Sequence, residues 1–331
     1  MWFKTIFRRR GAPRPEPGDQ GLTAPRLWRV RARPEPRPSA RLFDEAFLRR
    51  MERMSLQAQR TLRGNPSSGE HPSRHRMPAT IFSDHRPYTS GDDLRYVDWN
   101  AYARQDHVLV KLGDAEQDVH VHLLVDASRS MTVGEPPRLR LAQQIVGALG
   151  YLALAHSDRL QVVPFGPSAL RPFGPAQGKA HAFELLRYIE RIAPQPGTRL
   201  AAVVQQHARR NPQGGLMVIC SDLLAPDSLD EALRAVPPPR WQTVVLHLLD
   251  QRDLRPELQG PLELEDSETG QRLAITLDAE TLAAYRRSVA AWREGLGRIC
   301  ARRGATYAPV MSHWPLERQV VPYLRVRRVL T

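Results

Sequence analysis

The chain has 331 residues, a formal net charge of +13 and 41% hydrophobic residues. This length is enough for one large or two modest domains with a buried core. The longest nearly uninterrupted apolar run, residues 145–155, is much shorter than the roughly 20 residues of a membrane-spanning helix. Residues 1–10 also lack the apolar core of a signal peptide. We therefore expect a cytoplasmic protein without a transmembrane segment.

The chain contains two cysteines, Cys220 and Cys300. Two cysteines cannot form the disulfide framework of a small secreted protein. Each lies in an apolar pattern, which predicts a buried thiol in a reducing compartment.

The positive charge is concentrated at the N-terminus. Residues 1–63 hold 16 Lys and Arg against 6 Asp and Glu, so the rest of the chain is nearly neutral. Seven prolines alternate with arginines in residues 1–40, a composition that buries too little apolar surface to offset the entropy of ordering. We predict that residues 1–40 form a disordered basic arm, which serves solubility or, as a less favoured alternative, binds nucleic acid or an anionic membrane.

The first regular element that we expect is a helix near residues 45–62. A polar loop follows at residues 65–78, and a stretch dense in aspartate and arginine covers residues 86–104. Apolar residues recur at gaps of three and four in the first segment, which places them on one helical face: Phe47, Met51, Met54, Ala58 and Leu62.

Five short apolar runs predict the strands of a buried sheet. The first run, residues 119–125, ends at Asp126 and precedes a helix with an apolar face at residues 141–152. Such strands, alternating with helices, are typical of a mostly parallel sheet covered on both faces. The predicted fold class is α/β, with a doubly wound, mostly parallel, Rossmann-like sheet. The other runs lie at residues 160–164, 216–220, 243–249 and 305–310, and the further helices at about 179–193, 199–210 and 228–235.

The last helix has the clearest pattern. Apolar residues recur at gaps of three and four from Leu282 to Ile299, which is the spacing of one helical face. Asp278 can cap its beginning and Gly304 can end it.

Candidate ligands for a cation follow the predicted strands. Asp126, Ser128 and Ser130 come after the first strand, and Asp222 ends the third. Thr198 precedes an intervening helix. Loops at the carboxyl ends of parallel strands converge, so we expect these oxygen atoms to surround one point. Carboxylates and hydroxyls suit Mg²⁺, with Mn²⁺ as an alternative, whereas no Cys or His pair has the spacing of a zinc site.

This set of an Asp-x-Ser-x-Ser motif, a threonine and a second aspartate resembles the metal-ion-dependent adhesion site of von Willebrand factor type A domains. The resemblance implies that Asp126, Ser128, Ser130, Thr198 and Asp222 hold the ion. It also implies that a carboxylate of a partner protein fills a coordination position that these residues leave open.

The flanking segments resemble the bacterial domain-of-unknown-function family fifty-eight. The similar stretches lie at residues 45–62, 86–104, 111–112, 262–270 and 323–325, so the resemblance extends over about residues 41–331. Members of this family are typically encoded beside MoxR-type AAA+ ATPases. The resemblance therefore implies an adaptor or chaperone-like partner of such an ATPase.

These patterns predict four segments. Residues 1–40 form the basic arm, and residues 41–117 form a helix and an Arg/Asp-rich segment packed on the core. Residues 118–250 form a von Willebrand A-like core with the metal site. Residues 251–331 form an extension with the long helix and a last strand that completes the sheet.

The Arg/Asp-rich segment allows two interpretations. Its carboxylates could form a second metal site or act as general acids and bases. The interleaved arginines favour a structural network of ion pairs around Trp99, which could also bind a partner. The candidate residues are Arg86, Tyr88, Asp92, Asp93, Arg95, Asp98, Trp99, Arg104 and Asp106.

We find no motif for a catalytic nucleophile or a nucleotide. His120, His122 and His247 fall inside predicted strands, where a structural role is usual. The leading hypothesis is therefore a non-enzymatic, Mg²⁺-dependent protein-interaction module. The alternatives are a nucleic-acid-associated protein that uses the basic arm and, less favoured, a single-metal hydrolase.

Overall fold

The computed structural model divides the chain into two compact units, Met1–Leu56 with Val119–Thr331 and Gln57–Asp118. Each unit is described by itself. The basic arm, except residues 28–30, and the second half of the first predicted helix lie outside the described residues. The structure describes residues 28–30, 42–45, 47, 49–53, 76–78, 84–90, 92–105, 107–114, 119–224, 229–256 and 260–327.

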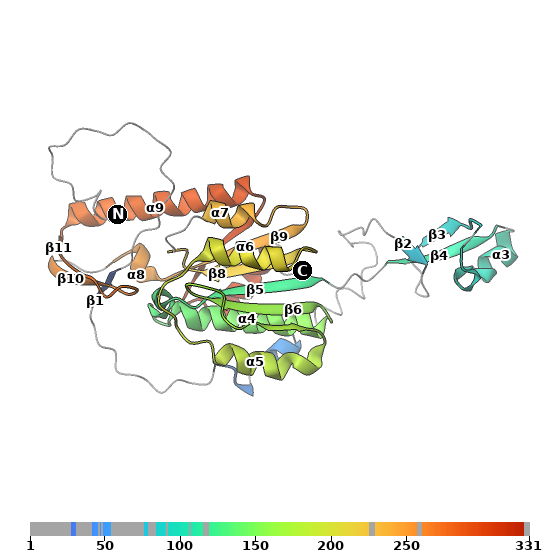
Figure 1. The fold of residues 1–331 in the computed structure, drawn as a ribbon, viewed down its shortest axis with the longest axis horizontal. Coiled ribbons are helices and arrows are strands. Elements are labelled where there is room, and N and C mark those ends of the chain that lie inside the picture. The colour runs from blue at the N-terminus through green and yellow to red at the C-terminus, as the bar shows by residue number, and fades with distance from the viewer. Residues whose placement is uncertain are drawn as a thin grey trace. The chain divides into compact units, whose positions relative to one another are not determined.

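A six-stranded sheet forms the centre of the larger unit (Figure 1), in the order β12-β9-β8-β5-β6-β7. All neighbouring strands pair in parallel except β6 and β7, which are antiparallel. The five predicted runs form the five parallel strands, so the predicted α/β fold with a mostly parallel sheet is confirmed. The strands are β5 (His120–Asp126), β6 (Arg159–Phe165), β7 (Phe173–Ala176), β8 (Gly215–Ser221), β9 (Trp241–Leu249) and β12 (Thr306–Met311).

Helices cover both faces of this sheet (Figure 1). Successive residues of a strand point to opposite faces, and β5 follows this rule. Its Leu123 and Val125 join the core cluster that contains Ile145, whereas Leu124 joins the cluster that contains Val204 and Trp292. The first face carries α4 (Arg138–Ala155) and α5 (Ala182–Glu190), and the second carries α6 (Leu200–Arg210), α7 (Leu229–Arg234) and α9 (Ala279–Arg302).

The strand order identifies one position in the sheet where a ligand can bind. In chain order, β6 lies on one side of β5, while β8, β9 and β12 extend on the other. The connections after β5 and β8 therefore leave in opposite directions and open a crevice beyond the carboxyl ends of these two strands. Doubly wound folds bind their ligands at such a switch point.

A second, antiparallel sheet belongs to the same unit and has the order β1-β10-β11. It consists of β1 (Trp28–Val30), β10 (Gly260–Asp266) and β11 (Arg272–Leu277). The sequence patterns did not predict this hairpin. The disorder predicted for residues 1–40 does not hold for β1, because its backbone pairs with the edge of β10.

Short elements complete the larger unit: η2 (Arg129–Thr132), η3 (Lys179–His181), α8 (Gln251–Leu254), a π-helix (Leu316–Val320) and α10 (Val321–Val326). None of the helices that the structure describes has both the length and the apolar character needed to cross a membrane.

The smaller unit contains a three-stranded antiparallel sheet with the order β2-β4-β3. Asp98 begins its α-helix, because the Asp98 carboxylate accepts hydrogen bonds from the amides of Asn100 at 3.0 Å and Ala101 at 3.1 Å. The elements are β2 (Arg76–Pro78), β3 (Asp84–Pro87), η1 (Leu94–Tyr96), α3 (Trp99–Gln105) and β4 (Leu109–Asp114).

Candidate functional site

Three loops that carry the predicted metal ligands converge at the switch point between β5 and β8. The loop after β5 is tied to the loop before α6, because the Gln195 amide donates a hydrogen bond of 2.6 Å to the Ala127 carbonyl oxygen. A parallel β-bridge between Ser128 and Gln195 joins the same two loops. The side chains of all five predicted ligands are buried: Asp126, Ser128, Ser130, Thr198 and Asp222.

Asp126 is the most deeply buried carboxylate of this group. One of its oxygens accepts a hydrogen bond from the Ser128 amide at 2.9 Å, and the other accepts one from the Ser221 hydroxyl at 2.6 Å. Burial raises the pKa of Asp126, and the nearby Asp222 carboxylate raises it further. The protein environment therefore disfavours two negative charges here unless a cation compensates them.

Two buried oxygen atoms of the predicted ligand set lack a hydrogen-bond partner. They are Thr198 Oγ1 and Asp222 Oδ2. Leaving a buried oxygen atom without a hydrogen bond costs about 1–3 kcal/mol, and at Asp222 Oδ2 the Arg138 guanidinium, 3.7 Å away, provides an ion pair but no hydrogen bond. A cation that prefers oxygen ligands would give both atoms a partner, so the residues present fit Mg²⁺ or Mn²⁺.

Hydroxyl groups are an essential part of this candidate site. The hydroxyl oxygens of Ser128 and Ser130 lie 2.9 Å apart. Across the described part of the chain, no three His, Cys, Asp or Glu side chains gather where they could hold a metal ion. A cation at this position would therefore depend on Ser and Thr oxygens and on water as well as on two carboxylates.

Arg138, at the beginning of α4, supports the loops from within the protein. Its side chain is 1% exposed, and its guanidinium donates a hydrogen bond of 2.8 Å to the Ser130 carbonyl oxygen. The same group pairs with Asp253 and lies 3.7 Å from Asp222 Oδ2. No sequence pattern indicated this residue, since an arginine in the first turn of a helix usually faces water.

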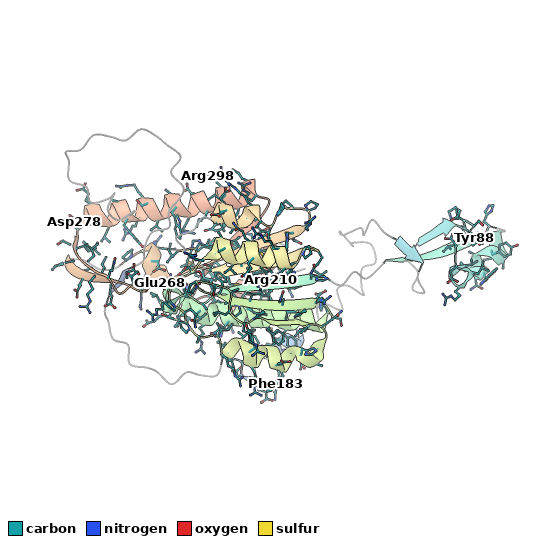
Figure 2. All side chains as sticks on the ribbon, in the orientation of Figure 1. Tyr88, Phe183, Arg210, Glu268, Asp278 and Arg298 are labelled. Carbon is teal, nitrogen blue, oxygen red and sulfur yellow. The ribbon has the colours of Figure 1, made fainter. Side chains whose placement is uncertain are left out.

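Glu268 was also missed as a site residue. It lies between β10 and β11, and Figure 2 shows it near the end of the sheet at which β5 and β8 finish. One carboxylate oxygen accepts a hydrogen bond of 2.7 Å from the Ser130 amide, and the other accepts one of 2.5 Å from the Gly197 amide. Glu268 therefore bridges two of the loops that carry predicted ligands. The only sequence signal was its presence in a stretch that carries the family resemblance.

The predicted network around Trp99 lies in the smaller unit. Arg95 pairs with Asp93 at 2.6 Å, and these hydrogen bonds hold the pKa of the Asp93 carboxyl below its usual value. Asp92 accepts hydrogen bonds from the amide and hydroxyl of Thr89 at 2.9 Å. With Asp98 at the beginning of α3, these carboxylates all have structural partners.

The other candidate residues of the Arg/Asp-rich segment lie in or next to β3 and α3. Arg86 lies in β3, and the Tyr88 amide donates a hydrogen bond of 2.9 Å to the Val108 carbonyl oxygen. Arg104 lies in α3, where Trp99 is 59% exposed and makes an edge-to-face contact with Tyr102. Asp106 lies outside the described residues. A role of this segment in partner binding stays a prediction.

The buried cysteines and histidines have structural environments. Burial raises the pKa of Cys220 and of Cys300 to about 12, so neither thiol is poised to react near neutral pH. His122 Nδ1 lies 3.0 Å from His207 Nε2, and burial lowers the pKa of both to about 4. Burial likewise lowers the pKa of His247 to about 3.

Residues 84–295 of the chain match the family described as "Protein of unknown function DUF58". The chain is 27% identical over 256 residues to uncharacterized proteins of Mycobacterium bovis and Mycobacterium tuberculosis, a match that covers 76% of this chain and 80% of each relative. An uncharacterized protein of Mycobacterium avium is 28% identical over 158 residues, which are 46% of this chain and 93% of that protein.

Two solved structures are similar to the chain at low identity. One is the conserved hypothetical protein BatB from Bacteroides thetaiotaomicron, with a TM-score of 0.44 and 18% identity over 64% of this chain and all of that structure. The other is an aerotolerance-related membrane protein from Bacteroides fragilis, with a TM-score of 0.39 and 16% identity over 64% of this chain and 96% of that structure.

Proposed function

The chain belongs to the family described as "Protein of unknown function DUF58", and from this premise we propose that it is a non-catalytic protein-interaction module. It binds Mg²⁺ in the manner of a von Willebrand factor type A domain. Asp126, Ser128, Ser130, Thr198 and Asp222 hold the ion, and a carboxylate of a protein partner docks on it.

The observation that carries this proposal is the set of unsatisfied oxygen atoms at the switch point. Asp126 and Asp222 are both buried and repel each other, and Asp222 Oδ2 and Thr198 Oγ1 have no hydrogen-bond partner. A stable core would avoid such a group of atoms, since each costs free energy. A bound divalent cation would remove the repulsion and satisfy both oxygens.

The chain itself supplies the rigidity of the site. The Ser128 amide and the Ser221 hydroxyl hold Asp126 in one orientation, and Arg138 holds the Ser130 carbonyl oxygen. The bound ion would supply a positive charge that attracts an acidic side chain. A contact of this kind is local and strong, and it is lost when the ion or one ligand is removed.

The partner class that we propose is a MoxR-type AAA+ ATPase, for which this protein would be an adaptor or chaperone-like factor. Support comes from the resemblance of the flanking segments to a family whose members are typically encoded beside such ATPases. The ATP hydrolysis would belong to the partner, because this sequence has no Walker A loop.

Binding of Mg²⁺ should raise the melting temperature of the protein. A ligand at about 100 times its dissociation constant stabilises a folded protein by about 2.7 kcal/mol, which corresponds to roughly 5–10 °C for a domain of this size. We expect Asp126→Asn to lose this shift while it remains folded, since asparagine keeps the shape of the side chain. Glu294→Ala, which changes an exposed carboxylate of α9, should keep the shift. Thermal melts in MgCl₂ and in EDTA measure both.

Partner capture tests the docking step. We expect a tagged MoxR-type ATPase to be retained by the wild-type chain in Mg²⁺, and to be lost in EDTA or with Asp126→Asn. Retention that ignores both changes would overturn the proposal. Mg²⁺-dependent turnover of phosphomonoesters or phosphodiesters, lost with Asp126→Asn, would show instead that the site is catalytic.

A further inference from the structure

The turn between β10 and β11 is built to project Glu268. Asp266 organises this turn, because one carboxylate oxygen accepts hydrogen bonds from the amides of Glu268 at 2.8 Å and Thr269 at 3.3 Å. The Gly270 amide donates to the Asp266 carbonyl oxygen at 2.8 Å. The paired register of β10 and β11 extends up to Glu265 and Arg272. The hairpin itself therefore sets the conformation of the turn that carries Glu268.

The carboxylate of Glu268 is bound by two backbone amides from outside the hairpin, which we call the receptor. Two backbone amides converge on it, those of Ser130 and Gly197, which lie 138 and 71 residues away in the chain. Gly197 has a φ of +74°, a conformation that other residues rarely adopt. Two amides from different loops that face one carboxylate, at 2.7 and 2.5 Å, form a specific anion-binding site.

Glu268 is the most exposed carboxylate near this receptor. Glu268 brings a further carboxylate to the two loops that hold Asp126 and Thr198, and the buried Arg138 donates to the Ser130 carbonyl oxygen in the first of these loops. Glu268 itself is only half-buried, whereas Asp126 and Asp222 are almost completely buried. The hairpin can therefore withdraw Glu268 into water more readily than the loops can expose their aspartates.

We infer that the amides of Ser130 and Gly197 form a carboxylate-binding site that Glu268 occupies from within the chain, and that an acidic side chain of a protein partner binds by displacing it. This inference rests on the proposed function, because it adds a second acidic contact for the same partner, on loops that also carry the proposed ion ligands. The β10–β11 hairpin then competes with the partner for this site. The apparent affinity for the partner equals the intrinsic affinity multiplied by the fraction of molecules in which Glu268 has left the site.

The test uses Glu268→Ala, which empties the receptor, and Glu263→Ala as the matched control on an exposed carboxylate of the same hairpin. The probes are acetate and a short Gly/Ser peptide with one glutamate, and the same peptide with glutamine is the negative control. Amide NMR signals of Ser130 and Gly197 report binding directly. We expect both carboxylate probes to bind Glu268→Ala at least about tenfold more tightly than the wild type, and Glu263→Ala to behave as the wild type does.

Two sources of the carboxylate are distinguished by these probes. Tighter binding of the glutamate peptide than of acetate supports a protein partner as the ligand. Equal binding of the two probes overturns the assignment of a protein partner and indicates a small carboxylate. Equal affinity of the wild type and Glu268→Ala, or no saturable shift in the variant, overturns the inference. If Glu268→Ala does not fold, Glu268→Gln serves instead, because its amide NH₂ faces a backbone N–H and weakens the same contact.

Measurements in Mg²⁺ and in EDTA separate this inference from the proposed function. If Glu268→Ala binds acetate in EDTA and Mg²⁺ has no effect on melting, the carboxylate site stands and the metal-dependent function fails. If Mg²⁺ raises the melting temperature but loss of Glu268 leaves acetate binding unchanged, the metal-dependent function stands and the inference fails.

Discussion

At the scale of single residues, this protein places polar groups in its core in pairs that neutralise or orient one another. Arg138 is fully buried, yet its guanidinium is shared between the Ser130 carbonyl oxygen and the Asp253 carboxylate. His122 and His207 form a second such pair, with 2% and 6% of their surfaces exposed. Both histidines are held neutral, because burial opposes their charged forms.

The His122–His207 pair predicts how stability depends on pH. In the folded protein the pKa of His207 is about 4, whereas an unfolded histidine titrates near 6.5. Between these values the unfolded state binds more protons, so the contribution of His207 is present above about pH 6.5 and is lost as the pH falls towards 4. We expect His207→Gln to flatten this pH dependence by up to roughly 1.4 kcal/mol per pH unit.

Urea denaturation of both proteins between pH 7 and pH 4 measures the difference. The raised pKa values of Asp126 and Asp253 act in the opposite direction, but they are present in both proteins and cancel in the comparison. His313→Gln is the control, since His313 is exposed and belongs to the same unit as His207. Identical slopes for the wild type and His207→Gln would contradict the prediction.

At the scale of elements, helix α9 shows how far local sequence patterns determine structure. The helix was predicted with its beginning at Asp278 and its end at Gly304, and the structure confirms both. The Asp278 carboxylate accepts a hydrogen bond of 2.7 Å from the Thr281 amide. Gly304 follows the last turn with a φ of +68°, which is the usual way for a helix to end.

Two glycines of this region should respond to alanine with opposite signs. At Gly304 a side chain would be strained by the positive φ and would lie 3.0 Å from Pro238, so Gly304→Ala should destabilise the protein by about 1–2 kcal/mol. Gly297 lies within α9, where a methyl group would meet Tyr307 at an ordinary 3.6 Å. Gly297→Ala should therefore stabilise it by about 0.5–1 kcal/mol.

The midpoint of urea denaturation is the measurement for both variants, and each serves as the control of the other. The same sign of change in both would show that the backbone conformations at these two positions are not those described.

At the scale of the whole molecule, the chain combines two units with very different cores. The larger unit has two extensive apolar clusters, one on each face of its sheet. In the smaller unit, Val97 and Val110 are the buried apolar residues among those whose exposure the structure describes. A small unit buries a smaller share of its surface and is less stable.

We therefore expect the smaller unit to unfold at a lower urea concentration than the larger one. Trp99 reports on the smaller unit, whereas Trp241 and Trp292 are buried in the larger one. Tryptophan fluorescence of the wild type should show two transitions, and Trp99→Phe should remove the signal of the first. A single transition that persists unchanged in Trp99→Phe would contradict this expectation.

The sequence alone determined the central architecture, because strands buried on both faces appear as continuous apolar runs and helices show their own period. Short-range patterns were sufficient for this result. They also drew attention to Asp126, Ser128, Ser130 and Asp222 after those strands and to Thr198 before a helix, and the role of these five residues as ion ligands stays a prediction. The edge strand β7 and the β10–β11 hairpin have weaker patterns and were not predicted.

Only the tertiary structure revealed Arg138 and Glu268 as parts of the site. Glu268 meets Ser130 across 138 residues, and Arg138 meets Asp253 across 115. No local pattern encodes such contacts, because the positions depend on how the hairpin and α4 pack beside the switch point of the sheet. Burial and long-range hydrogen bonding, rather than residue type, decided which charged side chains reach the loops.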